Sequence, residues 1–483
     1  MTNPLKKLFG EIAVYGLSSI IGRLLNYLLV PLYTYVFVNP ADYGVVSELY
    51  AWVAFLIVIL TFGMETAFFK FIQNENNKKN VFSTAFSTLL SLNSVFFFLI
   101  LIFNQDIASL LLYDGRGDYI IMLGAIVCVD AICALPLAKL RAEEKAKRFS
   151  VIQLSSIGVN ITLNLIFLLS FFDQNNPEQG VFYIFIANLF ASLVKPLFLF
   201  KSFGMLKGID WVLLKRMVLY SFPLAIAGFA GIINETLDRI LLKQMLYDSS
   251  SPSSLEYAEA QVGIYSASYK LAMLVTILLQ AYRYAAEPFF FSQMKNENRN
   301  KIYSQIMNVF IAFVCSVFLL VTLNIDLFKY FIQNEIYWAG LKVVPILLLA
   351  NIFLGIYYNQ SIWYKLSGKT KYGAYIALIG AFLTIIINVL YIPIYGYMAC
   401  AWATLIVYFV QMVISYFLGQ RHHPIPYNVK KFFFYIGFAL LLFAASPYLE
   451  VNNFALNLII QNSLLLMFVV IAVVLEKKNK EAF

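Results

Sequence analysis

The chain has 483 residues, of which 61% are hydrophobic and 13% are charged, and its formal net charge is +9. Its mean hydropathy is +0.76. A soluble domain has about 25% charged residues, so this composition excludes a soluble protein and indicates a polytopic membrane protein. Basic loops beside a membrane account for the positive charge, so it does not indicate nucleic-acid binding.

The apolar stretches divide into fourteen predicted membrane spans, since a span needs about 20 mostly apolar residues. The first stretch is too long for a signal-peptide core, so we expect an uncleaved span. The four cysteines fall within spans, which favours packing over disulfides. In chain order, the predicted spans cover residues 10–38, 43–70, 81–103, 119–139, 150–172, 181–201, 213–247, 260–291, 302–324, 339–366, 372–392, 397–419, 431–448 and 454–475.

Basic residues gather in the N-terminal segment, in every second loop and in the C-terminal tail. These segments hold 26 of the 35 lysines and arginines, whereas the alternate loops hold only Arg116 and Lys329. Because cytoplasmic loops carry an excess of Lys and Arg, this alternation predicts that both termini are cytoplasmic.

An internal repeat links the second and eighth spans. The segments "ADYGVVSELY" (41–50) and "AQVGIYSASY" (260–269) share four of ten residues, including Gly44 and Gly263. The repeat predicts two six-helix lobes in the same orientation, a pattern that recurs in transporters with a central site. We therefore predict an N-terminal lobe over residues 1–205, a C-terminal lobe over 206–425, and two further spans with a cytoplasmic tail over 426–483.

Ionisable residues inside the spans concentrate on spans 1, 2, 7 and 8. Each costs roughly 2.5–3.5 kcal/mol at mid-bilayer on insertion scales, so these groups must face protein or water. The segment "GIINETLDRILLKQML" places four of them at helical spacing, which predicts that they share one face. The basic candidates are Arg23, Arg239, Lys243, Lys270 and Arg283, and the acidic ones are Glu48, Glu65, Glu235, Asp238 and Glu287.

These charges allow two interpretations. In one, they form internal ion pairs, for which Glu235–Arg239 and Arg283–Glu287 have suitable spacing. In the other, they line a water-filled vestibule, where Arg23 is central and Lys243 and Lys270 also remain to meet an anion. Asp130 is the one deep charge on another span, and we expect Lys195 to extend its amine towards the membrane surface.

The ordered motifs "YGLSSIIGRLLNYLLVPLYT", "ADYG", "LPLAKLRAEEKAKRFS", "LDRILL" and "LSGKTKY" resemble the multidrug/oligosaccharidyl-lipid/polysaccharide (MOP) exporter superfamily, in its polysaccharide-transport and oligosaccharide-flippase branch. The resemblance implies an all-α, MATE-like protein of fourteen helices in the bacterial inner membrane. It implies flipping of a polyprenyl-pyrophosphate-linked oligosaccharide for surface polysaccharide such as O-antigen (lipopolysaccharide) or capsule. It also implies that Arg23, Arg239 and Arg283 bind pyrophosphate or acidic sugars, with Lys243 and Lys270 as further candidates. Membrane lipid, glycosyltransferases and a polymerase are the expected partners.

Several alternatives stay open at this point. A cation-coupled multidrug antiporter would use Glu235, Asp238 or Glu65 as its Na⁺ or H⁺ site, and Glu48 and Glu287 are further candidates for coupling or gating. A lipid II flippase is a second alternative. A membrane-embedded glycosyltransferase or polymerase would require a large external loop, which the chain lacks. No nucleophile–base pair, metal-ligand pair or cofactor motif is present in the sequence, so we predict a transporter rather than an enzyme.

Overall fold

The computed structural model describes residues 20–74, 78–204, 206, 208–251, 253–293 and 296–481. These residues form helices and connecting turns, with no strand in the described ranges. Thirteen helices are long and apolar enough to cross a membrane, and Ile20–Val36 is a shorter apolar helix. This short helix is the described part of the first predicted span, whose residues 10–19 lie outside the described residues. The prediction of an all-α polytopic membrane protein is confirmed.

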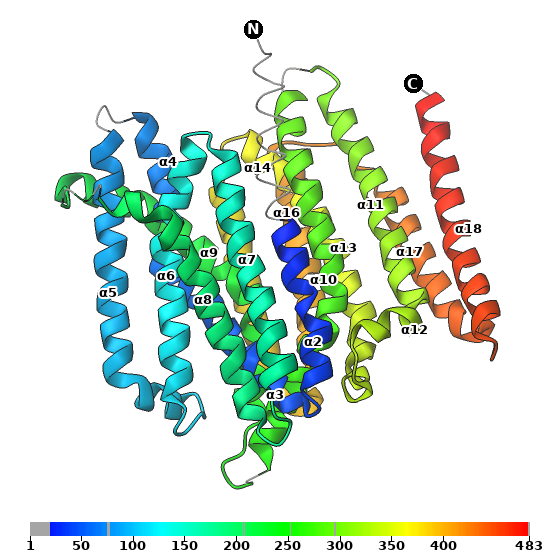
Figure 1. Ribbon diagram of the computed structural model, residues 1–483. Helices are drawn as coiled ribbons and strands as arrows, with labels where there is room; N and C mark the ends of the chain where they lie inside the picture. Colours follow the sequence, from blue (N-terminus) through cyan, green and yellow to red (C-terminus); the bar gives the residue numbers. More distant parts are fainter. Residues whose placement is uncertain are drawn as a thin grey trace. The chain divides into compact units, whose positions relative to one another are not determined.

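The chain divides into two compact units, the first ending at Gly263 and the second beginning at Ile264. Helix α10 (Ser254–Ser292) contributes to both. The first unit also contains α2 (Leu29–Val36), α3 (Pro40–Thr61), α4 (Met64–Asn74), α5 (Lys78–Leu110), α6 (Gly117–Ala142), α7 (Ala146–Ile166) with a π-helical end at Phe167–Phe171, α8 (Pro177–Phe203) and α9 (Trp211–Leu246). Within it, α6 packs against α5 and α8, α7 packs against α8, and α3 packs against α9 and α6 (Figure 1).

The second unit contains the remaining helices. They are α11 (Arg299–Leu323), α12 (Ile325–Phe328), the 3₁₀ turns Lys329–Phe331 and Glu335–Val343, α13 (Val344–Gln360), α14 (Ile362–Leu366), α15 (Lys371–Tyr395), α16 (Tyr397–His422), α17 (Val429–Ala445), the 3₁₀ turn Ser446–Leu449 and α18 (Phe454–Glu481). Helix α16 packs against α13 and α15, while α11 contacts α13, α17 and α18 (Figure 1).

The second predicted span is broken in the structure. Residues 43–70 were expected to form one helix, but α3 ends at Thr61 and α4 begins at Met64. Phe62 and Gly63 between them have positive φ angles of 49° and 63°. This left-handed backbone cannot continue a right-handed helix, so the chain changes direction there.

Helix α10 begins earlier than the sequence predicts. Residues 247–259 were expected to form an external loop because serines and two glutamates interrupt the apolar pattern. The structure instead starts the helix at Ser254, which places Glu256 and Glu259 on α10. This correction matters for the site, because Glu259 becomes a largely buried helical side chain, at 13% exposure.

The starts of α3 and α9 carry side-chain caps. Before α3, Asn39 accepts a hydrogen bond from the Ala41 N–H at 3.0 Å, and Pro40 occupies the first helical turn. Before α9, Asp210 accepts a hydrogen bond from the Leu213 N–H at 3.0 Å. That bond and the Asn80 amide lower the pKa of Asp210. Such caps satisfy N–H groups that have no partner within the helix.

Candidate functional site

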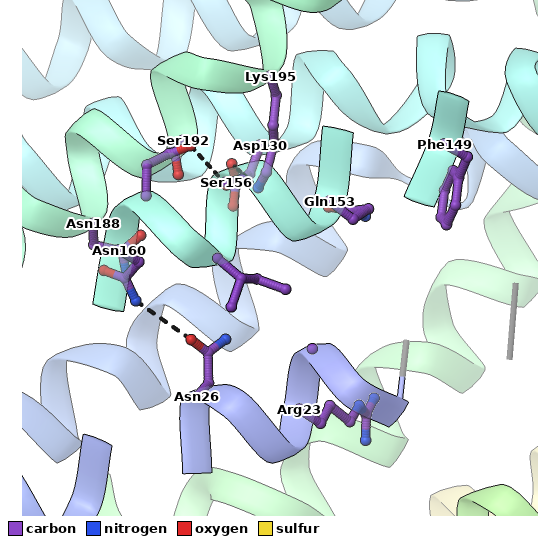
Figure 2. Close-up of a pocket in the computed structure, with 13 residues that line it drawn as sticks. Arg23, Asn26, Asp130, Phe149, Gln153, Ser156, Asn160, Asn188, Ser192 and Lys195 are labelled. Carbon is purple, nitrogen blue, oxygen red and sulfur yellow. Dashed lines mark hydrogen bonds and ion pairs between the residues drawn. The ribbon is translucent and has the colours of Figure 1, made fainter. Parts of the chain in front are cut away.

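A polar pocket lies within the helices of the first unit. It has a volume of about 340 Å³ and lies between helix Ile20–Val36 and helices α6, α7 and α8. Figure 2 shows the side chains that line it. Its polar lining residues are Arg23, Asn26, Asp130, Gln153, Ser156, Asn160, Asn188, Ser192 and Lys195. A pocket so rich in polar groups is costly inside an apolar membrane bundle unless it holds water or ligand.

Asp130 and Lys195 form an ion pair across this pocket. The Lys195 Nζ lies 2.7 Å from Asp130 Oδ1, joining α8 to α6, and the side chains are 15% and 31% exposed. The expectation that Lys195 extends towards the membrane surface was therefore wrong. An adjacent carboxylate at hydrogen-bond distance holds the ammonium more strongly than a distant interface would.

Amide and hydroxyl groups join the other walls of the pocket. The Asn160 amide donates to Asn26 Oδ1 at 3.4 Å, and Ser156 donates to the Ala191 carbonyl at 2.7 Å. The Asn188 amide donates to the Tyr50 hydroxyl of α3 at 2.7 Å, and Tyr50 itself does not line the pocket. These bonds fix the orientation of the amides, so the pocket presents polar groups in defined positions.

Arg23 lies at the edge of the pocket, separated from the Asp130–Lys195 pair in Figure 2. Its side chain is exposed. No carboxylate pairs with it among the residues that the structure describes. Asp130 therefore neutralises Lys195, and Arg23 gives the pocket a net positive charge. The prediction that Arg23 can meet an anion stays a prediction, but its surroundings are compatible with it.

Lys243 is placed differently from what the sequence predicts. Its side chain is fully buried, and its Nζ lies 3.1 Å from Glu48 Oε2 and 3.2 Å from Glu259 Oε1. The Leu111 carbonyl accepts a further hydrogen bond at 3.0 Å. Two carboxylates thus neutralise Lys243 in this conformation, so it is not available to an anion.

Lys243, Glu48, Glu259 and Tyr113 form a cluster, two members of which the sequence analysis did not identify as site residues. Glu259 was assigned to a loop, and Tyr113 lies in the turn between α5 and α6. The Tyr113 hydroxyl hydrogen-bonds to Glu48, and its ring centroid lies 3.3 Å from the Lys243 Nζ. If the helix of the eighth span is extended back to Ser254, Glu259 and Gly263 are four residues apart on one helix face. That spacing is the signal from which Glu259 could have been predicted.

The remaining charges of α9 do not share one face as predicted. Asp238 and Arg239 are buried at 5% and 8% exposure, whereas Glu235 is exposed. Arg239 Nη1 lies 3.3 Å from the Asp238 carboxylate and donates to the Glu235 backbone carbonyl at 2.9 Å. Neighbouring side chains on a helix diverge by about 100°. The long guanidinium folds back on its neighbour, so the predicted Glu235–Arg239 pair is replaced by Asp238–Arg239.

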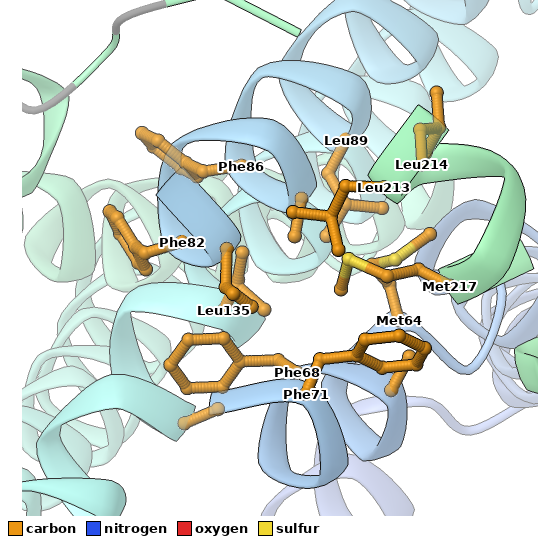
Figure 3. Packing of buried hydrophobic residues seen from close by; sticks show 14 residues of the cluster. Met64, Phe68, Phe71, Phe82, Phe86, Leu89, Leu135, Leu213, Leu214 and Met217 are labelled. Atoms are coloured by element: carbon orange, nitrogen blue, oxygen red, sulfur yellow. The ribbon is translucent and has the colours of Figure 1, made fainter. Parts of the chain in front are cut away.

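Glu65 is bound to a residue that the sequence assigns to a loop. Its carboxylate lies 2.6 Å from Arg141 Nη2, because α6 continues as far as Ala142. The pair borders an apolar cluster in which Phe68 and Phe71 of α4 pack with residues of α5, α6 and α9 (Figure 3). This contact anchors the segment after the break at Phe62–Gly63.

The predicted residues of the second unit lie on α10. The Arg283 guanidinium lies 4.2 Å from the ring centroid of Tyr358, within cation–π range. Lys270 is partly buried on the same helix. The Glu287 side chain lies outside the described residues, so its predicted pairing with Arg283 stays a prediction.

Comparison with known proteins identifies the family. The sequence profile of the family described as polysaccharide biosynthesis protein matches residues 8–294, more than half of the chain. The chain belongs to this family. Comparison with curated proteins gives no match.

Solved structures show the same fold at low sequence identity. The lipid II flippase MurJ in an inward closed conformation has a TM-score of 0.73 and 14% identity, over 96% of this chain and 99% of that one. An inward-facing multidrug resistance MATE family transporter of the MOP superfamily has a TM-score of 0.61 and 14% identity, over 85% of this chain and 94% of that one. The MATE-like fold that the resemblance implied is confirmed.

Proposed function

We propose that this protein is a transporter, which moves a polyprenyl-pyrophosphate-linked oligosaccharide from the cytoplasmic to the opposite leaflet of a membrane by alternating access. The product would serve surface polysaccharide assembly, such as O-antigen or capsule. The observation that carries the proposal is a polar pocket with one arginine unpaired in the described chain, inside a member of the polysaccharide biosynthesis family.

The chemistry of the pocket suits such a cargo. A guanidinium binds phosphate oxygens through two parallel hydrogen bonds, which assigns the pyrophosphate to Arg23. Amides and hydroxyls held by hydrogen bonds, such as those of Asn26, Asn160 and Ser156, can exchange hydrogen bonds with sugar hydroxyls. The apolar outer surface of the helices lets the polyprenyl chain stay in the bilayer while the polar head moves.

The distribution of basic residues supports the direction of transport. It favours a cytoplasmic location for both termini, and the membrane in which a lipid-linked glycan is assembled would be the bacterial inner membrane. Glycosyltransferases must supply this substrate, and a polymerase or ligase must consume it. We propose no cofactor, and Na⁺ or H⁺ coupling is the expected energy source.

Two other cargoes are favoured by specific likenesses. The MurJ likeness covers nearly the whole of both chains, which favours lipid II as a second candidate. The MATE likeness favours an organic cation exchanged for Na⁺ or H⁺. Lipid II also presents a polyprenyl pyrophosphate, so Arg23 would serve it equally, whereas an organic cation would be repelled by the net charge of the pocket.

Reconstitution of the full-length protein in liposomes tests the proposal. The rate of transbilayer movement is measured for a fluorescent short-chain polyprenyl-pyrophosphate oligosaccharide, for lipid II and for an organic cation. Arg23→Gln should slow the oligosaccharide at least about tenfold, because a hydrogen bond to a charged group contributes roughly 1.5–3 kcal/mol. The rate in Arg23→Lys should lie between those of the unsubstituted protein and Arg23→Gln, since lysine keeps the charge but lacks the two parallel N–H donors of a guanidinium.

Arg421→Gln is the matched control, because Arg421 is exposed at the end of α16 and is not among the residues that line the pocket. It should move the oligosaccharide at the unsubstituted rate. Movement of the oligosaccharide at the same rate in Arg23→Gln would exclude Arg23 from the mechanism. If lipid II or the organic cation moves faster than the oligosaccharide, that molecule is the cargo instead.

A further inference from the structure

Helices α3 and α10 touch backbone to backbone at a pair of glycines. A Cβ atom added to Gly44 would lie 1.9 Å from the Glu259 carbonyl oxygen, and one added to Gly263 would lie 1.9 Å from the Pro40 carbonyl oxygen. The contact is reciprocal, and any side chain there would clash with main chain. No room remains for water at this crossing, so it is closed in this conformation.

Charged side chains flank the crossing on both helices. Glu48 follows Gly44 by four residues on α3, and Glu259 precedes Gly263 by four on α10. Lys243, near the end of α9, reaches both carboxylates at 3.1 and 3.2 Å. Glu48 and Lys243 are fully buried, and the Glu259 side chain is 13% exposed. The three side chains therefore tie three helices together at the closed crossing.

The hydrogen bonds of this cluster are nearly complete. Lys243 has three N–H donors, and it has three acceptors in Glu48, Glu259 and the Leu111 carbonyl. Glu48 also accepts from the Trp52 indole at 3.1 Å and from the Tyr113 hydroxyl. Such a network holds its members in one arrangement, and separation of α3 from α10 must break it.

The charges of the cluster do not balance without a further positive group. One ammonium faces two carboxylates, and an uncompensated charge in a dry interior is strongly unfavourable. Arg116, in the turn after α5, and Arg239, on α9, pair with Glu178 and Asp238. Other ionisable groups on the elements around the cluster include Asp42 and Tyr43 on α3, Asp238 and Arg239 on α9, Glu256 on α10, and Tyr113, Asp114 and Arg116 in the turn after α5.

We propose that Glu48, Lys243 and Glu259 form a proton-binding latch that holds α3 against α10. In the closed state the two carboxylates share one proton. Separation of the helices admits water, both carboxylates ionise, and the proton leaves to solvent. Because the closed state binds one more proton than the open one, low pH favours closure, by up to about tenfold per pH unit. The latch acts whatever cargo the transporter carries.

Cysteine accessibility tests the latch. In a full-length variant without native cysteines, Ser47 beside Glu48 is replaced by Cys, and labelling by a membrane-impermeant maleimide is followed against pH. A cysteine at the exposed Ser250 corrects for ionisation of the thiol. The corrected labelling rate at position 47 should rise with pH. Glu48→Gln with Glu259→Gln should remove this rise, since no carboxylate then binds the proton and the remaining Lys243 can only release one on closure.

Two further variants separate charge from packing. Lys243→Met leaves two carboxylates facing each other without the ammonium, so position 47 should label faster than in the parent at the pH values where both carboxylates are ionised. The triple variant Lys243→Met, Glu48→Gln, Glu259→Gln is uncharged and of similar size, so it should label slowly and independently of pH. Lys431→Met is the matched control, because it breaks a Lys–Glu pair in the second unit and should leave labelling unchanged.

Two outcomes would refute the proposed latch. A persistent rise of labelling with pH in the double glutamine variant would show that the proton binds elsewhere, and parental labelling in Lys243→Met would show that the lysine does not hold the helices. If Lys243→Met does not accumulate, the double and triple variants still decide the question. No glycan is used, so failure of the latch is distinct from failure of the proposed cargo.

Discussion

The glycine crossing provides the sharpest test of the packing between α3 and α10. Gly44→Ala would place a methyl carbon 1.9 Å from the Glu259 carbonyl oxygen, whereas ordinary contact begins at 3.4 Å. The obstacle is backbone, so no rotamer change relieves it, and the two helices must separate by about 1.5 Å. Overpacking of a close contact costs typically 1–3 kcal/mol. We therefore expect the melting temperature of the purified protein to fall by several degrees.

Gly158→Ala is the matched control. Gly158 is also helical, on α7, but a Cβ there meets nothing within 4 Å. Alanine is favoured over glycine in a helix by up to about 1 kcal/mol, so this variant should melt at the same temperature or slightly higher. Thermal unfolding followed by tryptophan fluorescence in detergent measures both variants in parallel.

The reciprocity of the contact adds a second requirement. Gly263→Ala should destabilise the protein as much as Gly44→Ala, because its Cβ meets the Pro40 carbonyl oxygen at the same 1.9 Å. Once one substitution has separated the helices, the other needs little further movement, so the double variant should be less destabilised than the sum. An unchanged melting temperature in Gly44→Ala, or full additivity, would refute the reasoning.

Three further predictions concern single features. Lys195→Met should lower the melting temperature more than Lys195→Met with Asp130→Asn, because the single change leaves a carboxylate without its partner; equal losses would contradict this. Phe68→Ala should destabilise by about 3–5 kcal/mol because the ring is fully buried (Figure 3), whereas Phe98→Ala, at 62% exposure, should have little effect on the same unfolding measurement. His423 lies after α16, and burial, with help from Arg299, lowers its pKa below the usual 6.5. The unfolded state therefore binds more protons than the folded state, so stability should fall as the pH drops below 6.5. In a pH series of melting temperatures, His423→Gln should show a smaller decrease over this range.

The sequence predicted the membrane spans because hydropathy is a local property. Thirteen of the expected spans correspond to candidate spans in the structure. The break at Phe62–Gly63 was missed, since neither residue interrupts the apolar pattern and no proline marks the turn. The start of α10 was also missed, because Glu256 and Glu259 look like loop residues until their partners are known.

Pairing partners could not be predicted, because they depend on which helices cross. The spacing rule favoured Glu235 for Arg239, but the structure gives it Asp238. Lys195 and Asp130 lie 65 residues apart, and nothing local connects them. The repeat did contain a usable signal: Gly44 and Gly263 occupy equivalent repeat positions, and the structure places them in contact.

The pairing of the deep charges also decides which one can serve a ligand. A charged group at mid-bilayer is costly, and a partner on a neighbouring helix removes most of that cost. Lys243, Lys195 and Arg239 each have a carboxylate within 3.3 Å. Arg23 has no such partner in the described part of the chain and borders a pocket of about 340 Å³. A cation without a protein carboxylate is stable there only with water or an anion beside it, and for that reason Arg23 is the residue on which cargo recognition should depend most strongly.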